Sequence, residues 1–258
     1  MNRIDQLFQR KSKDIMSVYF TAGYPQKDDT VKIIKELEES GADMIELGIP
    51  FSDPVADGPV IQESNKVALE NGMNLSVLFE QLGDIRQKTE IPILLMGYFN
   101  SVFHYGVEKF CRKCREIGID GVILPDMPVE VFREQYKPHF RKNNLYNIFL
   151  VAPTTAKERL RQILPEAKGF VYMVSSSSTT GNMNSTNSQL NYVETIREVR
   201  QEIPVMTGFG IDDREKFREV CRYANGGIIG SAFIKALINH DGKMDYRIKS
   251  FIQSIKET

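Results

Sequence analysis

The 258-residue chain has no tryptophan, only three cysteines and three histidines, and a net charge of −1. His104, His139 and His240 stand singly, so no metal cluster or Ser-His-Asp triad is visible. The near-neutral charge gives no electrostatic footprint for nucleic acid or an anionic membrane. No apolar run approaches the length of about 18 residues that spans a bilayer, and Met1 to Arg10 lacks a signal-peptide core. We therefore expect a cytoplasmic protein that binds neither nucleic acid nor membrane.

The few cysteines do not indicate a redox or metal site. Cys111 and Cys114 form a C-x-x-C pair, a pattern found in redox and zinc proteins. Both, however, fall in a helical apolar stripe, and no second C-x-x-C or paired histidine completes a zinc site. Cys221 lies in a similar stripe. We interpret all three as core residues and expect no bound metal.

What the chain does contain is a regular alternation of apolar segments and helical patterns. The apolar segments are Ser17–Thr21, Asp43–Ile49, Ile91–Tyr98, Asp120–Pro125, Tyr146–Ala152, Gly169–Val174, Ile203–Thr207 and Gly226–Gly230. Strands alternating with helices indicate a parallel α/β sheet, and eight strands close a (β/α)8 TIM barrel. We expect a single-domain barrel over residues 1–258 with an extra N-terminal helix. An open doubly wound sheet is the alternative, but the first loop, Thr21 to Pro25, is not a Gly-rich dinucleotide loop.

Capping residues predict where some helices begin and end. Asp28 and Asp212 precede helical patterns and are candidate N-caps. Gly41 and Gly118 stand just before strand segments, where a helix commonly ends in a left-handed residue.

The most informative stretch runs from Met44 to Pro59. It places Glu46 inside a buried apolar strand, where an ionised side chain is expensive without a partner or a function. Asp53 and Asp57 follow in a Pro/Gly-rich loop. An acid at the end of a buried strand below a loop is a candidate proton-transfer group. Taken alone, Glu46 could instead be a structural residue whose carboxylate pairs with a neighbouring Lys or a backbone amide.

Small Gly-bearing turns follow the last three strand segments, at 175–181, 208–212 and 230–232. Glycine admits close approach of backbone N–H groups, and loops after strands seven and eight commonly bind phosphate in this fold. We expect a phosphorylated small-molecule substrate and chemistry by proton transfer: isomerisation, aldol-type cleavage or hydrolysis. The polar segment 175–190 is interpreted as a lid, and 50–60 as a second mobile loop.

The segment Glu46 to Pro59 closely resembles the signature of the tryptophan synthase alpha chain family. Further motifs follow in family order: Phe20–Pro25, Met96–Asn100, Pro125–Pro128, Gly208–Ile211 and Gly230–Ala232. The resemblance implies a TIM-barrel lyase of L-tryptophan biosynthesis that cleaves indole-3-glycerol phosphate to indole and glyceraldehyde 3-phosphate, a retro-aldol reaction. It also implies a separate beta chain as partner, in an alpha2-beta2 heterotetramer. Pyridoxal phosphate is then expected on the beta chain and no cofactor on this one.

The resemblance assigns roles to individual residues. Glu46 matches the general acid and base, and Asp57 the carboxylate that hydrogen-bonds the indole N–H. Burial should raise the pKa of Glu46, whereas the better-solvated Asp57 should stay ionised. Asp53 is expected to shape the loop or meet the partner. The remaining implied substrate contacts are Tyr19 and Ile61 beside the indole, Tyr172, the lid residue Thr180, Phe209, and Gly181, Gly210, Gly230 and Ser231 around the phosphate.

The loop from Ser175 to Gly181 departs from the family pattern. Ser178 stands where a glycine is usual, and Ser176 where an arginine is common. Loss of the glycine restricts the backbone and puts lid closure in question. Two other functions stay open at this point: a stand-alone indole-releasing lyase or another phosphate-handling barrel enzyme, and a catalytically poor barrel that serves as an allosteric binding subunit. Retention of Glu46 and Asp57 argues against the binding subunit.

Overall fold

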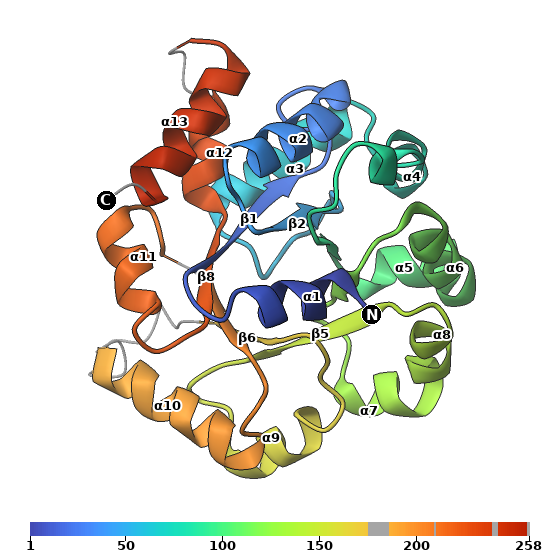
Figure 1. The fold of residues 1–258 in the computed structure, drawn as a ribbon. Helices are drawn as coiled ribbons and strands as arrows, with labels where there is room; N and C mark the ends of the chain where they lie inside the picture. The colour runs from blue at the N-terminus through green and yellow to red at the C-terminus, as the bar shows by residue number, and fades with distance from the viewer. Residues whose placement is uncertain (175–185, 209, 239–241, 257–258) are drawn as a thin grey trace.

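The computed structural model describes residues 1–174, 186–208, 210–238 and 242–256. Its eight strands run parallel, each beside the next in sequence, and β8 pairs with β1 to close a barrel (Figure 1). The strands are β1 (Ile15–Thr21), β2 (Met44–Gly48), β3 (Ile93–Met96), β4 (Gly121–Ile123), β5 (Tyr146–Val151), β6 (Val171–Val174), β7 (Val205–Gly208) and β8 (Gly226–Ile229). Each predicted segment overlaps one observed strand, which confirms the TIM barrel.

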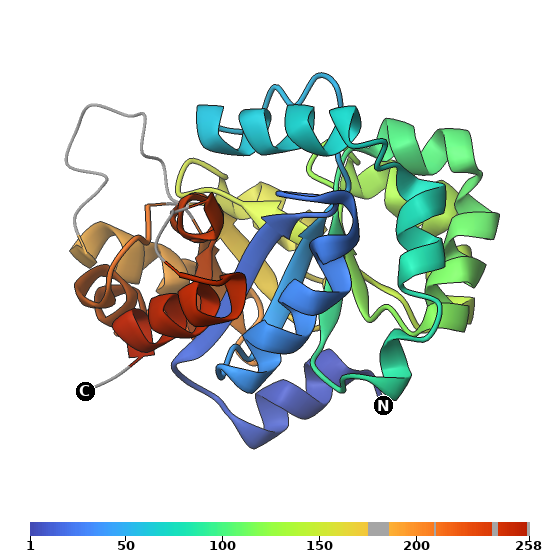
Figure 2. The ribbon, with the colours of Figure 1, turned by 90° about the horizontal axis from the view of Figure 1, so that it is seen from above.

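Helices surround the barrel (Figures 1 and 2). They are α1 (Arg3–Arg10), α2 (Thr30–Glu39), α3 (Pro59–Glu70), α4 (Leu75–Gln81), α5 (Phe99–Tyr105), α6 (Val107–Ile117), α7 (Val129–Val131), α8 (Lys137–Lys142), α9 (Lys157–Ile163), α10 (Thr186–Val199), α11 (Arg214–Val220), α12 (Ser231–Ile238) and α13 (Met244–Lys256). Short 3-10 turns η1 (Lys27–Asp29) and η2 (Ile85–Gln87) and the π-helical turn η3 (Phe132–Tyr136) complete the set. Within the described ranges, no helix combines the length and apolarity that a membrane crossing needs.

The predicted helix caps are partly correct. Gly118 ends α6 in the left-handed region, at φ 81° and ψ 32°, as expected. The N-cap of α11 is Asp213, whose carboxylate accepts a hydrogen bond from the backbone N–H of Lys216. Asp212, the predicted cap, instead pairs with the Lys216 ammonium at 2.6 Å. Asp28 is not a cap either, because it lies within η1, which leads directly into α2.

Two apolar clusters hold the barrel together, one inside it and one between strands and helices. Ile4 and Leu7 of α1 belong to the inner cluster, so α1 closes the N-terminal end of the barrel (Figure 2). Phe170, just before β6, and inward residues from the strands complete this cluster; the strand residues are Ile15, Met44, Leu94, Ile123, Tyr146, Ile148, Tyr172, Met206 and Ile228. The outer cluster includes Cys111, Cys114 and Cys221, which are buried free thiols. Their interpretation as core residues is confirmed.

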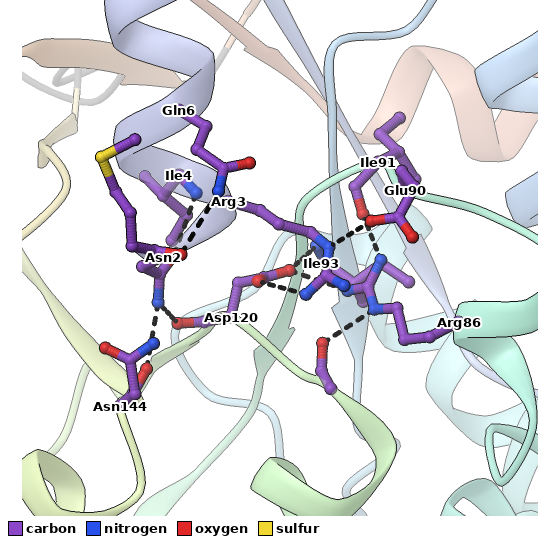
Figure 3. Close-up of polar contacts among 12 residues, drawn as sticks. Asn2, Arg3, Ile4, Gln6, Arg86, Glu90, Ile91, Ile93, Asp120 and Asn144 are labelled. Carbon is purple, nitrogen blue, oxygen red and sulfur yellow. Dashed lines mark hydrogen bonds and ion pairs between the residues drawn. The ribbon is translucent and has the colours of Figure 1, made fainter.

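Asp120, directly before β4, fastens α1 to the barrel (Figure 3). Its carboxylate is 4% exposed and lies 3.3 Å from Arg3 Nη1 and 2.7 Å from Arg86 Nη2. The same carboxylate accepts a hydrogen bond from the Ile93 backbone N–H at 3.0 Å. Asn2, the N-cap of α1, donates its side-chain N–H to the Asp120 carbonyl at 2.8 Å. A buried carboxylate with two cations and an amide thus joins three segments that are distant in sequence.

We expect Asp120→Ala to lower the free energy of unfolding by about 3 to 5 kcal/mol, because it leaves a largely buried guanidinium and an amide without their acceptor. Glu90→Ala is the matched control, since Glu90 is the other partner of Arg3 but is 76% exposed. Glu90→Ala should lower the free energy of unfolding by less than about 1 kcal/mol. Urea denaturation followed by circular dichroism measures both, and similar losses would contradict a special role for Asp120.

Candidate active site

Glu46 lies on the inner face of β2 and is fully buried. Side chains alternate along a strand, and the pairing of Glu46 with Tyr19 of β1 fixes its height in the barrel. Oε1 accepts a hydrogen bond from the Ser17 hydroxyl at 2.9 Å. Oε2 has no hydrogen-bond partner among the described residues. One carboxyl oxygen is therefore anchored, and the other remains for a ligand.

Glu46 lines a cavity of about 470 Å³ at the C-terminal ends of the strands. Every predicted site residue that the structure describes lines it: Glu46, Asp57, Tyr19, Ile61, Tyr172, Gly210, Gly230 and Ser231. The predicted contacts Thr180, Gly181 and Phe209 lie outside the described residues. The structure thus brings together side chains from strands and loops that are spread over most of the chain.

A second, smaller cavity of about 150 Å³ adjoins the first. The two share Tyr19, Asp57, Met96 and Tyr172. The smaller one is lined otherwise mainly by apolar groups, namely Ile49, Ala56, Gly97, Pro125, Leu150 and Val174, with Tyr98 and Asn65. An apolar cavity beside a carboxylate suits an aromatic ring that carries one N–H group.

Asp57 is held at the edge of both cavities by the loop after β2. The Ala56 backbone N–H donates to the Tyr98 hydroxyl at 3.0 Å, and that hydroxyl lies 3.5 Å from Asp57 Oδ2. The Tyr98 ring stacks on Phe51 with centroids 4.8 Å apart. Asn65 Oδ1 accepts from the Phe51 N–H at 2.9 Å. Tyr98 and Asn65 therefore position the loop, a role that the sequence analysis did not assign to either residue.

The two carboxyl groups differ in their ionisation. Burial raises the pKa of Glu46 to about 8, and the hydrogen bond from Ser17 only partly opposes this. Burial also raises the pKa of Asp57, to about 6, against a smaller opposing effect of Tyr98. Asp57 is half-buried and so less solvated than expected, yet a pKa of about 6 leaves it mainly ionised at neutral pH. At a pH between these two pKa values, Glu46 is mainly protonated and neutral while Asp57 is mainly ionised.

The other end of the larger cavity can receive an anion. Gly230 and Ser231 lie at the start of α12, and Gly210 has a φ of 75°, which favours glycine. Lys235 lies one turn after Ser231 on the same helix face and is the one Lys or Arg among the described residues that line this cavity. Asp212 lines it too, but pairs with Lys216.

Lys235 was missed by the sequence analysis, although its spacing of four residues from Ser231 is visible in the sequence. The segment 175–185 contains no Lys or Arg, so this segment brings no cationic side chain of these two types to the site.

Known proteins resemble this chain over nearly its whole length. The sequence model of the family described as "Tryptophan synthase alpha chain" matches residues 5–258. The tryptophan synthase alpha chain of Flavobacterium psychrophilum is 54% identical over 238 residues, covering 92% of this chain and 94% of the relative. That of Christiangramia forsetii is 51% identical over 257 residues, covering 99% of each chain.

Solved structures agree with these relatives. The crystal structure of the tryptophan synthase alpha chain from Legionella pneumophila has a TM-score of 0.88 at 33% identity, covering 99% of this chain and 96% of that one. A chain of the aminoacrylate-bound crystal structure of tryptophan synthase from M. tuberculosis has a TM-score of 0.86 at 30% identity, with 99% and 98% covered. From its sequence and its fold alike, this chain belongs to the tryptophan synthase alpha chain family.

Proposed function

We propose that Glu46 and Asp57 are the catalytic pair with which this carbon–carbon lyase cleaves indole-3-glycerol phosphate to indole and glyceraldehyde 3-phosphate. One observation carries the proposal: both carboxyl groups line the same cavity. Glu46 is fully buried and has a strongly raised pKa, whereas Asp57 is half-buried and mainly ionised at neutral pH. Carboxyl groups whose environments separate their pKa values can take the roles of acid and of charge stabiliser.

The proton balance of the reaction suits this pair. Near neutral pH, protonated Glu46 donates its proton to C3 of the indole ring, and Asp57 accepts a hydrogen bond from the indole N–H and stabilises the positive charge that develops. The Glu46 carboxylate then takes the proton of the glycerol hydroxyl nearest the ring. The bond between C3 and that carbinol carbon breaks, and its electron pair returns to the ring. The hydroxyl oxygen becomes the aldehyde oxygen, and Glu46 is protonated again.

The two cavities suggest how the substrate lies. The smaller, apolar cavity takes the indole ring, with Asp57 at its edge and Tyr19 and Tyr172 between it and the larger cavity. The phosphate then reaches the backbone N–H groups near Gly210, Gly230 and Ser231, with Lys235 beside them. Glu46 lines the larger cavity and pairs in the barrel with Tyr19, which both cavities share, so its carboxyl group can reach the carbon atoms that join the ring to the glycerol chain.

The partner of this lyase is the tryptophan synthase beta chain, which consumes the indole. Because the cleavage needs only proton transfers, we propose that this chain requires no cofactor and that pyridoxal phosphate belongs to the beta chain. A cytoplasmic location is part of the proposal and is supported by three cysteines that remain free thiols. A single folding domain with mobile loops at 50–60 and 175–190 also stays a prediction, and most of the second loop lies outside the described residues.

We expect Glu46→Gln to reduce indole release by a factor of roughly 10² to 10⁴, because the amide cannot transfer the proton. Indole released from indole-3-glycerol phosphate is measured for the isolated chain and again with the beta chain. Asp53→Asn is the control in the assay of the isolated chain, since Asp53 is an exposed carboxylate in the same loop as Asp57 and should leave that rate close to the unaltered value. Full activity of Glu46→Gln would move the chemistry to another residue. Absence of indole release from the unaltered chain under both conditions would favour the binding-subunit alternative.

The pH dependence of kcat/KM should be bell-shaped. Below about pH 6 Asp57 becomes protonated and loses its charge, and above about pH 8 Glu46 loses the proton that it must donate. In Asp57→Asn the acidic limb should disappear while the overall rate falls. The range from pH 5 to pH 9 includes both pKa values. A kcat/KM profile that stays level over this range would contradict the roles proposed for Glu46 and Asp57.

Lys235→Gln should raise KM for indole-3-glycerol phosphate about fivefold, the effect of losing about 1 kcal/mol from an exposed charge pair. The increase should shrink at high salt, which screens the wild-type attraction. Lys88→Gln is the control, because Lys88 is an exposed lysine that pairs with Asp84, and neither residue is among the described residues that line the cavity. An equal effect of both substitutions would show a general loss of charge instead of a phosphate contact.

A further inference from the structure

Ser17 is a buried polar residue on the inner face of β1, between Ile15 and Tyr19. Its side chain is fully buried, and its hydroxyl lies 2.9 Å from Glu46 Oε1. It is not among the described residues that line either cavity at the C-terminal end. Ser17 thus touches the proposed acid without being placed to touch the substrate.

We propose that Ser17 is a positioning residue for the lyase reaction: its hydroxyl holds Oε1 of Glu46, so that Oε2 is the oxygen that exchanges protons with the substrate. This inference rests on the proposed role of Glu46. It adds which carboxyl oxygen reacts and which residue selects it.

The strand register explains the selection. Ser17 pairs with Met44, and Tyr19 pairs with Glu46, so Ser17 lies one inward position closer to the N-terminal end of the barrel. The hydroxyl therefore reaches the carboxyl group from below, while the cavity lies above it at the C-terminal end. A hydrogen bond from that side leaves Oε2, which has no partner among the described residues, as the oxygen available to a ligand.

The same bond is compatible with both states of the acid. When Glu46 is ionised, the Ser17 hydroxyl donates to a carboxylate oxygen, an interaction stronger than a bond between neutral groups. When Glu46 is protonated and Ser17 still donates to Oε1, that oxygen is the carbonyl and the proton lies on Oε2. In this arrangement, with Ser17 as the donor, the proton lies on the side of the substrate. Stabilising the ionised form also limits how far burial raises the pKa of Glu46.

The decisive variant is Ser17→Ala, which removes the hydroxyl and little volume. Because the ionised form loses its donor, the alkaline limb of the kcat/KM profile should move up by about one pH unit. We also expect kcat to fall about tenfold while KM stays unchanged, since orientation and not binding is lost. Ser17→Thr keeps a hydroxyl and should return the limb toward its original position.

Ser64→Ala is the matched control, because Ser64 is a fully buried serine whose hydroxyl bonds Thr21 Oγ1 at 2.7 Å and is not bonded to Glu46. The alkaline limb of the kcat/KM profile of Ser64→Ala should stay at the pH of the unaltered protein. An unmoved limb in folded Ser17→Ala would overturn the inference. If that variant does not fold, Ser17→Cys, a weaker donor, should move the limb in the same direction, and an unmoved limb there would overturn it equally. The proposed function fails separately, if Glu46→Gln retains indole release.

Discussion

The Glu46 carboxyl is enclosed by a closed ring of eight parallel strands and is fully buried, and among the described residues its side-chain partner is one neutral hydroxyl, that of Ser17. Ionisation in such a place is unfavourable, because the charge loses water and no cation from the described part of the chain pairs with it. The acid consequently keeps its proton up to a pH of about 8. Asp57, at the same cavity, is less buried and has a lower pKa of about 6, so the two carboxyl groups differ in charge at neutral pH.

The two buried carboxyl groups of the barrel, Asp120 and Glu46, have different surroundings and different pKa values. Asp120, at the N-terminal end, is surrounded by Arg3, Arg86 and a backbone amide, which offset part of the rise in pKa that burial causes. Glu46 forms no ion pair with the residues that the structure describes, and burial raises its pKa to about 8. The first carboxylate fastens the helix that closes the barrel, and the second remains available as an acid.

Local patterns in the sequence predict the barrel, the unusual position of Glu46 and the Gly-bearing turns, whereas the roles of Asp57, Tyr19, Ile61 and Tyr172 were implied only by the family resemblance. Apolar runs alternate with helical periods, and a carboxyl group inside an apolar strand such as Glu46 is unusual enough to be recognised. The contacts of Ser17 and Tyr98 could not be predicted in this way, since they depend on register between strands and on the path of a loop. The cap of α11 was placed one residue too early because Asp212 and Asp213 are equally suitable in sequence, and only the backbone geometry distinguishes them.

The protonation state of Glu46 can be observed directly by infrared difference spectroscopy of the unaltered protein against Glu46→Gln, recorded from pH 5 to pH 10. The account predicts a protonated carboxyl band that persists at neutral pH and disappears with a midpoint near the pKa of about 8. A band that is already absent at neutral pH would mean that Glu46 is ionised there. It could not then be the acid that begins the reaction.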